Sequence, residues 1–186
     1  SAEPTVSLVG TTSFNLLWEE VCAKVMGDCR RETLNTLELQ PPEGLSAHAT
    51  LMDIIPRPEW RHYDSNKVHT ASATLIPDLI TVSDQGIAIY DAKYYRIQLD
   101  EKGISHQPGV GDVTKQHLYE LAYRKLAERN QLSIAGNAFL MPLDGDEEQH
   151  IGEVSINLFS GLESPLEKIK VILKPCEKMF AAYLEG

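Results

Sequence analysis

The sequence predicts an α/β fold in which a central mixed β-sheet is flanked by helices. Two observations lead to this prediction. Apolar residues recur with helical spacing near both ends and in the middle of the chain, and shorter runs typical of strands lie between them. The order is therefore helix, strands, helix, strands, helix, without an internal repeat. The 186 residues, 42% of them hydrophobic, suffice for one domain with a substantial core, so we expect a single domain over 1–186.

The first helix is expected at 14–26, where apolar side chains recur every three or four residues and Gly27 follows at the C-terminal end. Residues 1–12 are small and polar, which predicts a flexible lead-in. The chain begins with Ser in place of Met, and we expect it to be a fragment of a longer protein.

The next segments carry weaker patterns. Residues 28–48 predict an irregular excursion, and 49–70 predict a strand and loop around Trp60. Because tryptophan is large and mostly buried on average, we expect both Trp18 and Trp60 in the core. Residues 75–95, LIPDLITVSDQGIAIYDAKYY, then predict a hairpin whose two strands are separated by Ser-Asp-Gln-Gly at 83–86.

A second helix is expected at 112–129, with Asp112 as its N-cap, after a break at Pro108 and the glycines that follow. Four apolar residues at helical spacing predict its core stripe. They are Leu118, Leu121, Ala122 and Leu126. The remaining elements are predicted as strands at 134–141 and 153–159, a short helix at 164–169 and a terminal helix at 176–184.

Composition limits the classes of function. The sequence has no apolar run of about 18 residues and no secretory signal pattern, so we expect a soluble, cytoplasmic protein without membrane contact. Its three cysteines form no Cys-x-x-Cys pair, and its six histidines no His-x-x-x-His pair, which argues against structural zinc. The net charge of −10 disfavours a protein that wraps nucleic acid, because such binding depends on Lys and Arg, but a metal site beside phosphate also needs carboxylates.

Charged residues in the predicted hairpin form a candidate site. If Ser83 pairs with Gly86, the register places Asp78 opposite Asp91, about 5 Å away across the strands. Lys93 lies two residues beyond Asp91 and therefore shares its face. A one-residue shift at the turn would separate them.

This trio has two interpretations. A surface salt bridge would contribute little stability. However, Ile87 and Ile89 share the same face, which predicts that the trio lies beside buried sheet, where two uncompensated acids are costly. A hard divalent cation would offset them, and Mg²⁺, for which Mn²⁺ substitutes, accepts carboxylate and phosphate oxygens. Lys93 would then position a water molecule or stabilise charge at phosphorus.

The trio resembles a known signature. Pro77-Asp78, followed after twelve residues by Asp91-Ala92-Lys93, resembles the PD-(D/E)xK motif of restriction-endonuclease-like nucleases. The helix at 109–126 is similar to the Gln-containing helix of that superfamily. Together, IPD, IYDAKYY and GVGDVTKQHLYELAY resemble the LlaJI-type restriction endonucleases, relatives of the McrC-like nuclease subunit of McrBC systems. The resemblance covers roughly 14–130.

The resemblance implies a restriction-endonuclease-like core and Mg²⁺-dependent hydrolysis of DNA. Asp78, Asp91 and the Ala92 carbonyl would hold the metal, and Lys93 would position water. Gln116, which shares a helical stripe with Tyr119 and Tyr123, would complete the pocket or else be a helix-surface amide.

Nucleases of this kind also tend to carry an acid on the first helix. Glu20 is four residues from Lys24, which predicts a solvated surface pair. Glu19 shares its face with apolar neighbours, so it is the expected additional metal ligand, directly or through water.

The resemblance also implies an antiphage restriction system that acts on double-stranded DNA. An AAA+ GTPase motor subunit and a target-reading domain outside this chain would assist it. A recombination nuclease such as a junction resolvase, or a noncatalytic DNA-binding scaffold, are the alternatives. Tyr94, Tyr95 and the basic stretch at 57–67 are candidate DNA contacts.

Overall fold

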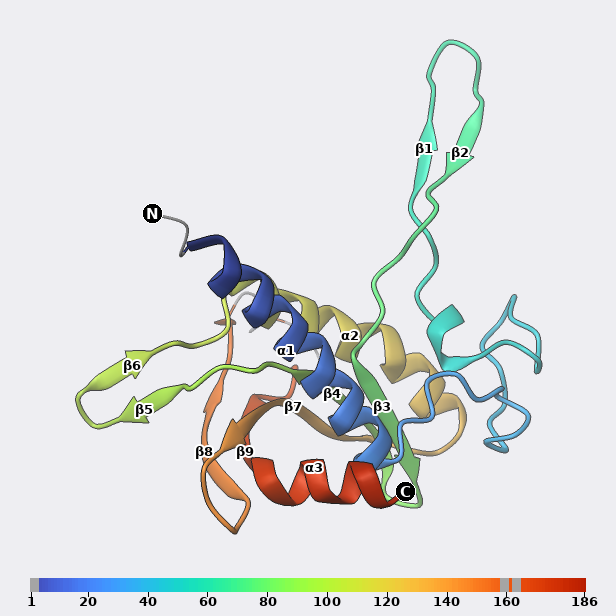
Figure 1. The fold of residues 1–186 in the computed structure, drawn as a ribbon. Coiled ribbons are helices and arrows are strands. Elements are labelled where there is room, and N and C mark those ends of the chain that lie inside the picture. Colours follow the sequence, from blue (N-terminus) through green and yellow to red (C-terminus); the bar gives the residue numbers. More distant parts are fainter. Residues whose placement is uncertain (1–3, 158–160, 162–164) are drawn as a thin grey trace.

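A computed structural model describes residues 4–157, 161 and 165–186, with side chains from residue 13 onward. Its centre is a mixed five-stranded sheet in the order β3-β4-β7-β9-β8 (Figure 1). The pairs β4/β7 and β7/β9 are parallel, and β3/β4 and β8/β9 are antiparallel. The strands are β3 Leu79–Ser83, β4 Gly86–Ala92, β7 Ile134–Leu143, β8 Gln149–Val154 and β9 Ile169–Pro175.

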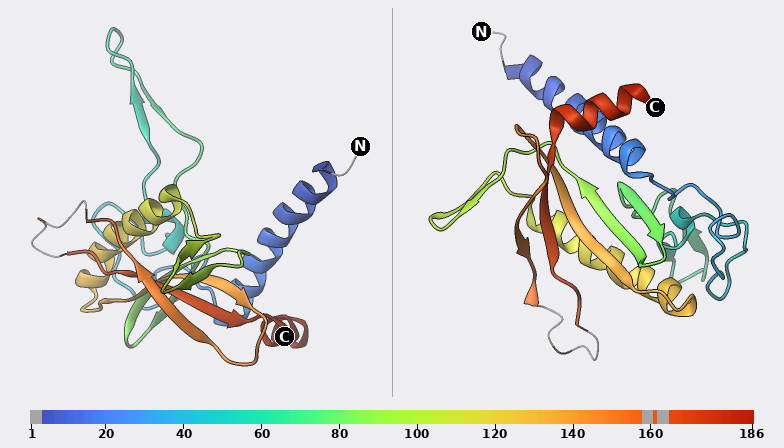
Figure 2. Two further views of the ribbon diagram at one scale, coloured as in Figure 1. Left: turned by 90° about the vertical axis from the view of Figure 1, so that its left-hand side faces the viewer. Right: turned by 90° about the horizontal axis from the view of Figure 1, so that it is seen from below.

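Helices cover both faces of this sheet, as predicted (Figure 2). The helices α1 (Pro4–Met26) and α3 (Cys176–Glu185) pack on one face, through a buried cluster that includes Trp18 and Met179. The opposite face carries α2 (Val110–Arg129). On β4, Ile87 and Ile89 point toward α2. Because both faces are covered, β4 is buried along nearly its whole length.

Two small antiparallel ribbons project from this body (Figure 1). One consists of β1 (Glu59–Arg61) and β2 (Val68–Thr70), preceded by a 3₁₀ turn at Leu51–Asp53. The other consists of β5 (Gln98–Asp100) and β6 (Gly103–Ser105). The first ribbon lies in the region predicted as a strand and loop, but Trp60 is 71% exposed, so its predicted core position is wrong. Trp18 is fully buried, as predicted.

Three predicted boundaries differ from the structure. The helix α1 begins at Pro4, so residues 4–12 extend the helix instead of forming a separate lead-in. The strand predicted at 153–159 is displaced to β8, and residues 158 and 159 lie outside the described part. Residues 165–168 of the predicted short helix are not helical, Ser164 is not described, and Ile169 starts β9.

The helix α2 also differs from its prediction. Its N-cap is Gly109, and Asp112 accepts the Gly109 N–H at 3.1 Å from the third helical position instead of being the N-cap itself. Of the predicted core stripe, only Leu126 is fully buried, and Leu118 is 39% exposed. The buried stripe instead contains Gln116, Tyr119 and Tyr123.

The tyrosines occupy the buried stripe because each hydroxyl has a partner. Tyr119 donates to the Ile76 carbonyl at 3.0 Å, and Tyr123 donates to the Leu51 carbonyl at 2.7 Å. A tyrosine with a satisfied hydroxyl packs as a large apolar ring. In the described part of the chain, the three cysteines are free thiols and no helix is long and apolar enough to cross a membrane.

Candidate active site

The hairpin β3–β4 has the register that the sequence predicts. Ser83 is opposite Gly86, and the pairing continues to Leu79 opposite Tyr90. One further step places Asp78 opposite Asp91. Both side chains therefore lie on the face that is covered by α2.

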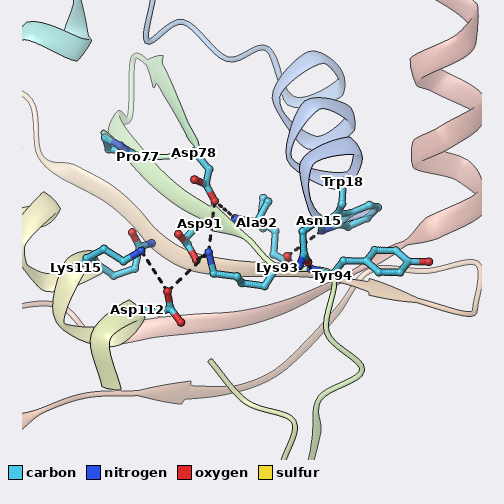
Figure 3. A network of polar contacts seen from close by, with 12 residues as sticks. Asn15, Trp18, Pro77, Asp78, Asp91, Ala92, Lys93, Tyr94, Asp112 and Lys115 are labelled. Carbon is cyan, nitrogen blue, oxygen red and sulfur yellow. Dashed lines mark hydrogen bonds and ion pairs between the residues drawn. The ribbon is translucent and has the colours of Figure 1, made fainter. Parts of the chain in front are cut away.

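Lys93 joins the two acids in one ionic cluster (Figure 3). Its Nζ lies 2.8 Å from Asp91 Oδ2 and 3.9 Å from Asp78 Oδ2. The Asp91 side chain is only 3% exposed, and those of Asp78 and Lys93 are mostly buried. This burial excludes the interpretation as a solvated surface pair.

The backbone around Asp78 is held from two sides. Asp78 Oδ2 accepts the Ala92 N–H at 2.9 Å, which ties the start of β3 to the end of β4. Arg30, in the loop after α1, donates to the Pro77 carbonyl at 2.8 Å. Asp28 pairs with Arg30 and also accepts the Ile80 N–H at 2.9 Å. The outer edge of β3 is therefore fixed by this loop.

Burial and mutual repulsion set the charge states of the cluster. Burial, followed by the negative charge of Asp78, raises the pKa of Asp91 to about 7, although Lys93 opposes this shift. Burial also raises the pKa of Asp78, against the lowering effect of Lys93. For Lys93, burial alone would lower the pKa, but the carboxylates of Asp91 and Asp78 outweigh it and raise it to about 12. The lysine is therefore a fixed cation beside two acids that resist simultaneous ionisation.

A residue that the sequence analysis did not assign to the site also reaches the cluster. Asp112 Oδ1 lies 3.9 Å from Lys93 Nζ and 3.2 Å from Lys115 Nζ (Figure 3). Asp112 lies in the first turn of α2, and its other carboxylate oxygen accepts the Gly109 N–H. The sequence places Asp112 in the helix that follows the β3–β4 hairpin, but its contact with Lys93 depends on how α2 docks.

Glu19 is half-buried on α1, near the cluster but without a direct ion pair to it among the described residues. Burial raises its pKa, and the charges of Lys93 and Asp91 act on it in opposite directions. No three His, Cys, Asp or Glu side chains of the described chain come together as a metal-binding group. Glu20 accepts a hydrogen bond from the Tyr183 hydroxyl at 2.5 Å, and its predicted partner Lys24 donates to the Tyr183 carbonyl at 3.0 Å.

Gln116 is fully buried, which excludes a helix-surface amide. Its Nε2 donates to Asn137 Oδ1 at 3.1 Å and to the Ala138 carbonyl at 3.2 Å, and so connects α2 with β7. Among the described residues its Oε1 has no hydrogen-bond partner. Asn137 on β7 pairs with Ile89 on β4. The next residue of β4 on the same face is Asp91, which pairs with Phe139. Gln116 therefore lies beside the cluster, and its amide bonds to β7.

The candidate DNA contacts Tyr94 and Tyr95 are half-buried. The ring of Tyr94 stacks on Phe14 with 5.7 Å between centroids and meets Trp18 edge-on. Tyr95 packs against the buried cluster formed by β7 and β9. Both rings support the body of the protein.

The donor set fits a hard divalent cation. Asp78 and Asp91 supply carboxylate oxygens from adjacent strands, and Mg²⁺ binds in proteins through one or two carboxylates. The buried Asp91 Oδ2 has the Lys93 ammonium as its charge partner, 2.8 Å away. A second positive charge would offset both the burial and the repulsion by Asp78 that raise the Asp91 pKa.

Comparison with known proteins places the chain in a family. The model of the LlaJI restriction endonuclease family matches residues 45–174, which include Asp78, Asp91 and Lys93. The chain belongs to the LlaJI restriction endonuclease family. The match extends through β7 and β9, well beyond the region that carried the sequence resemblance.

A named relative of this LlaJI family member comes from Bacillus subtilis (strain 168). The chain is 30% identical over 192 residues to the type II restriction enzyme BsuMI component YdjA. The alignment covers 100% of this chain and 36% of the relative, so the chain spans about a third of the length of that protein. No solved structure matches the chain significantly.

Proposed function

We propose that residues 1–186 form the nuclease domain of a restriction system and hydrolyse phosphodiester bonds of double-stranded DNA with Mg²⁺, for which Mn²⁺ substitutes. The observation that carries this proposal is the buried convergence of Asp78, Asp91 and Lys93 on one face of β3–β4 in a chain of the LlaJI family. Two acids and one lysine provide ligands for a cation and a donor for phosphate chemistry.

Each residue has a distinct role in the proposed reaction. Asp78 and Asp91, with the Ala92 carbonyl, would hold the cation, and Glu19 would contribute directly or through water. A cation held there would supply Lewis-acid chemistry at the phosphate. Lys93, kept protonated by its acidic neighbours, orients the attacking water and stabilises negative charge on the phosphoryl oxygens.

Two further residues position this machinery. Gln116 anchors α2 to β7, the strand that pairs with β4, and β4 carries Asp91. Asp112 holds the Lys93 ammonium from the side of α2. We assign both residues to positioning, because their contacts go to other side chains and to backbone.

The assembly around the domain is also part of the proposal. The name of the B. subtilis relative describes it as a component of a restriction enzyme, which supports a system of several parts. We propose an AAA+ GTPase motor subunit that moves DNA, and a target-reading domain outside this chain.

The test uses the full-length protein with plasmid DNA, Mg²⁺ and GTP, with and without the candidate motor subunit. Asp91→Ala and Lys93→Ala should each reduce cleavage by at least about 10²-fold, the scale of losing one transition-state donor. The matched controls are Glu101→Ala and Lys102→Ala, which remove an exposed acid and an exposed lysine elsewhere. Cleavage by either site variant at the unaltered rate would refute the mechanism. Nucleotide-independent cleavage confined to branched DNA would indicate a junction resolvase.

A further inference from the structure

The ribbon β1–β2 and its flanks, residues 57–70, form an arm that extends away from the sheet (Figures 1 and 2). Every residue of this arm is exposed. Trp60 is 71% exposed and Tyr63 at the tip is 92% exposed. A two-stranded ribbon that nothing covers is marginally stable in water. Large aromatic rings held in this position indicate a surface that a partner covers.

The register divides the arm into two different faces. Trp60 lies opposite His69, and the His62 N–H donates to the Lys67 carbonyl at 2.9 Å, which continues the same register. Since cross-strand partners share a face, these four side chains lie together. Their face carries one tryptophan, two histidines and one lysine, and no carboxylate. Glu59 points to the other face.

The base of the arm is fastened beside the proposed active site. The Thr74 hydroxyl donates to the Pro56 carbonyl at 2.9 Å, and this bond connects the chain segments before and after the arm. Tyr119 and Arg30 then hold the carbonyls of Ile76 and Pro77, the two residues before Asp78. A ligand held by the arm is therefore linked through a few anchored residues to the start of β3.

We propose that the arm binds double-stranded DNA, with the carboxylate-free face against a groove, and so directs the duplex to the cluster at Asp78. The major groove of DNA admits a two-stranded β-ribbon. Lys67 contacts a phosphate, and Trp60 packs against sugar and base edges. In a chain with a net charge of −10, a face with positive and aromatic groups and no acid is complementary to a polyanion. This inference rests on the proposed function.

Tryptophan fluorescence tests the inference directly, because the protein domain has two tryptophans and only Trp60 is exposed. The experiment uses the full-length protein with the cleavage-deficient change Asp91→Asn and a short DNA duplex. Any tryptophans outside this domain are corrected for with Trp60→Phe. DNA should quench the Trp60 emission. An emission that saturating DNA leaves unchanged would overturn the proposal.

Measurements of DNA affinity provide a second test. Trp60→Ala combined with Lys67→Ala should weaken duplex binding roughly tenfold or more, and Lys67→Ala alone should reduce the salt slope of log K by about one. The matched control changes the other ribbon, as Lys102→Ala with Ile104→Ala, where Ile104 is 51% exposed. The control should bind as the parent does. Equal weakening by both pairs, or unchanged affinity of the arm variant, would contradict the inference.

Failure of the inference differs from failure of the proposed function. With an intact active site, the arm variant should recover cleavage when DNA exceeds its weakened dissociation constant. If the unaltered protein cuts DNA and the arm variant binds and cuts equally well, the inference fails alone. If the arm variant keeps its DNA affinity but loses binding to the motor subunit, the arm is a protein-docking surface and the inference is wrong. If the unaltered protein binds DNA through the arm but never cuts, the proposed function fails.

Discussion

Two successive hairpins of this chain have opposite surroundings. The arm hairpin β1–β2 is exposed on both faces, whereas the hairpin β3–β4, which carries the proposed active site, is buried on both faces along most of its length. Each carries acidic and basic side chains. In the arm, water solvates these charges, and they remain available to a partner. In β3–β4, each charge must be compensated by its neighbours inside the protein.

The difference explains how a reactive site is kept in place. Asp78, Asp91 and Lys93 are held by helices on both faces of the sheet and by the loop at the β3 edge, so their relative positions do not depend on solvent. The arm has no such support, and its side chains are open to solvent. The first hairpin is therefore suited to recognition and the second to chemistry.

The largest expected difference between the hairpins concerns apolar packing. Ile89→Ala in β4 removes a fully buried side chain and should lower the free energy of unfolding by about 2–5 kcal/mol. Val68→Ala in β2 removes a side chain that is 41% exposed and should change it by less than about 0.5 kcal/mol. Urea unfolding of both variants measures the two values. Similar losses would show that the arm is packed in solution.

The two turns should differ next. Gly86 has φ 130°, and a Cβ there would lie 2.2 Å from the Ser133 carbonyl oxygen. Gly86→Ala should therefore cost more than about 1 kcal/mol of stability. Asn66, in the arm turn, has φ 51°, and Asn66→Gly should change stability by less than about 0.5 kcal/mol, because glycine adopts that conformation readily. Thermal unfolding compares them, and a harmless Gly86→Ala would contradict the close approach of β4 and Ser133.

A smaller effect should appear in the pH dependence of the metal-free protein. The pKa of Asp91 is raised to about 7 in the folded state, above its unfolded value, so its contribution to stability is complete below the unfolded pKa and is lost as pH rises through 7. Asp91→Asn removes this dependence. In EDTA, the stability of the unaltered protein relative to this variant should fall by up to about 1.4 kcal/mol per pH unit between pH 4 and 7.

The control for this measurement comes from the arm. Asp64→Asn removes an exposed carboxylate at the tip of the arm. The difference in unfolding free energy between the unaltered protein and this variant should stay small at every pH. A stability difference between the unaltered protein and Asp91→Asn that is constant from pH 4 to 8 would contradict the burial of two acids in one cluster.

The sequence predicted local features well because their causes are local. Alternating residues and the Ser-Asp-Gln-Gly turn determine the β3–β4 register, and this register brings Asp78 and Asp91 together. The buried face of α2 was predicted wrongly because the tyrosine hydroxyls at 119 and 123 find carbonyl partners that are distant in sequence. Trp60 was assigned to the core for its size, but burial depends on the elements that cover a ribbon. Asp112 was missed for the same reason, since its contact with Lys93 depends on how α2 docks.

The central claim is that Asp78 and Asp91 together bind a divalent cation. Titration of the metal-free protein with Mn²⁺, with unbound Mn²⁺ measured by electron paramagnetic resonance, tests it most directly. We expect saturable binding that Asp78→Asn and Asp91→Asn each abolish and that the arm variant Lys67→Ala leaves unchanged. Binding of the same strength in both site variants, or no saturable binding by the unaltered protein, would contradict the account.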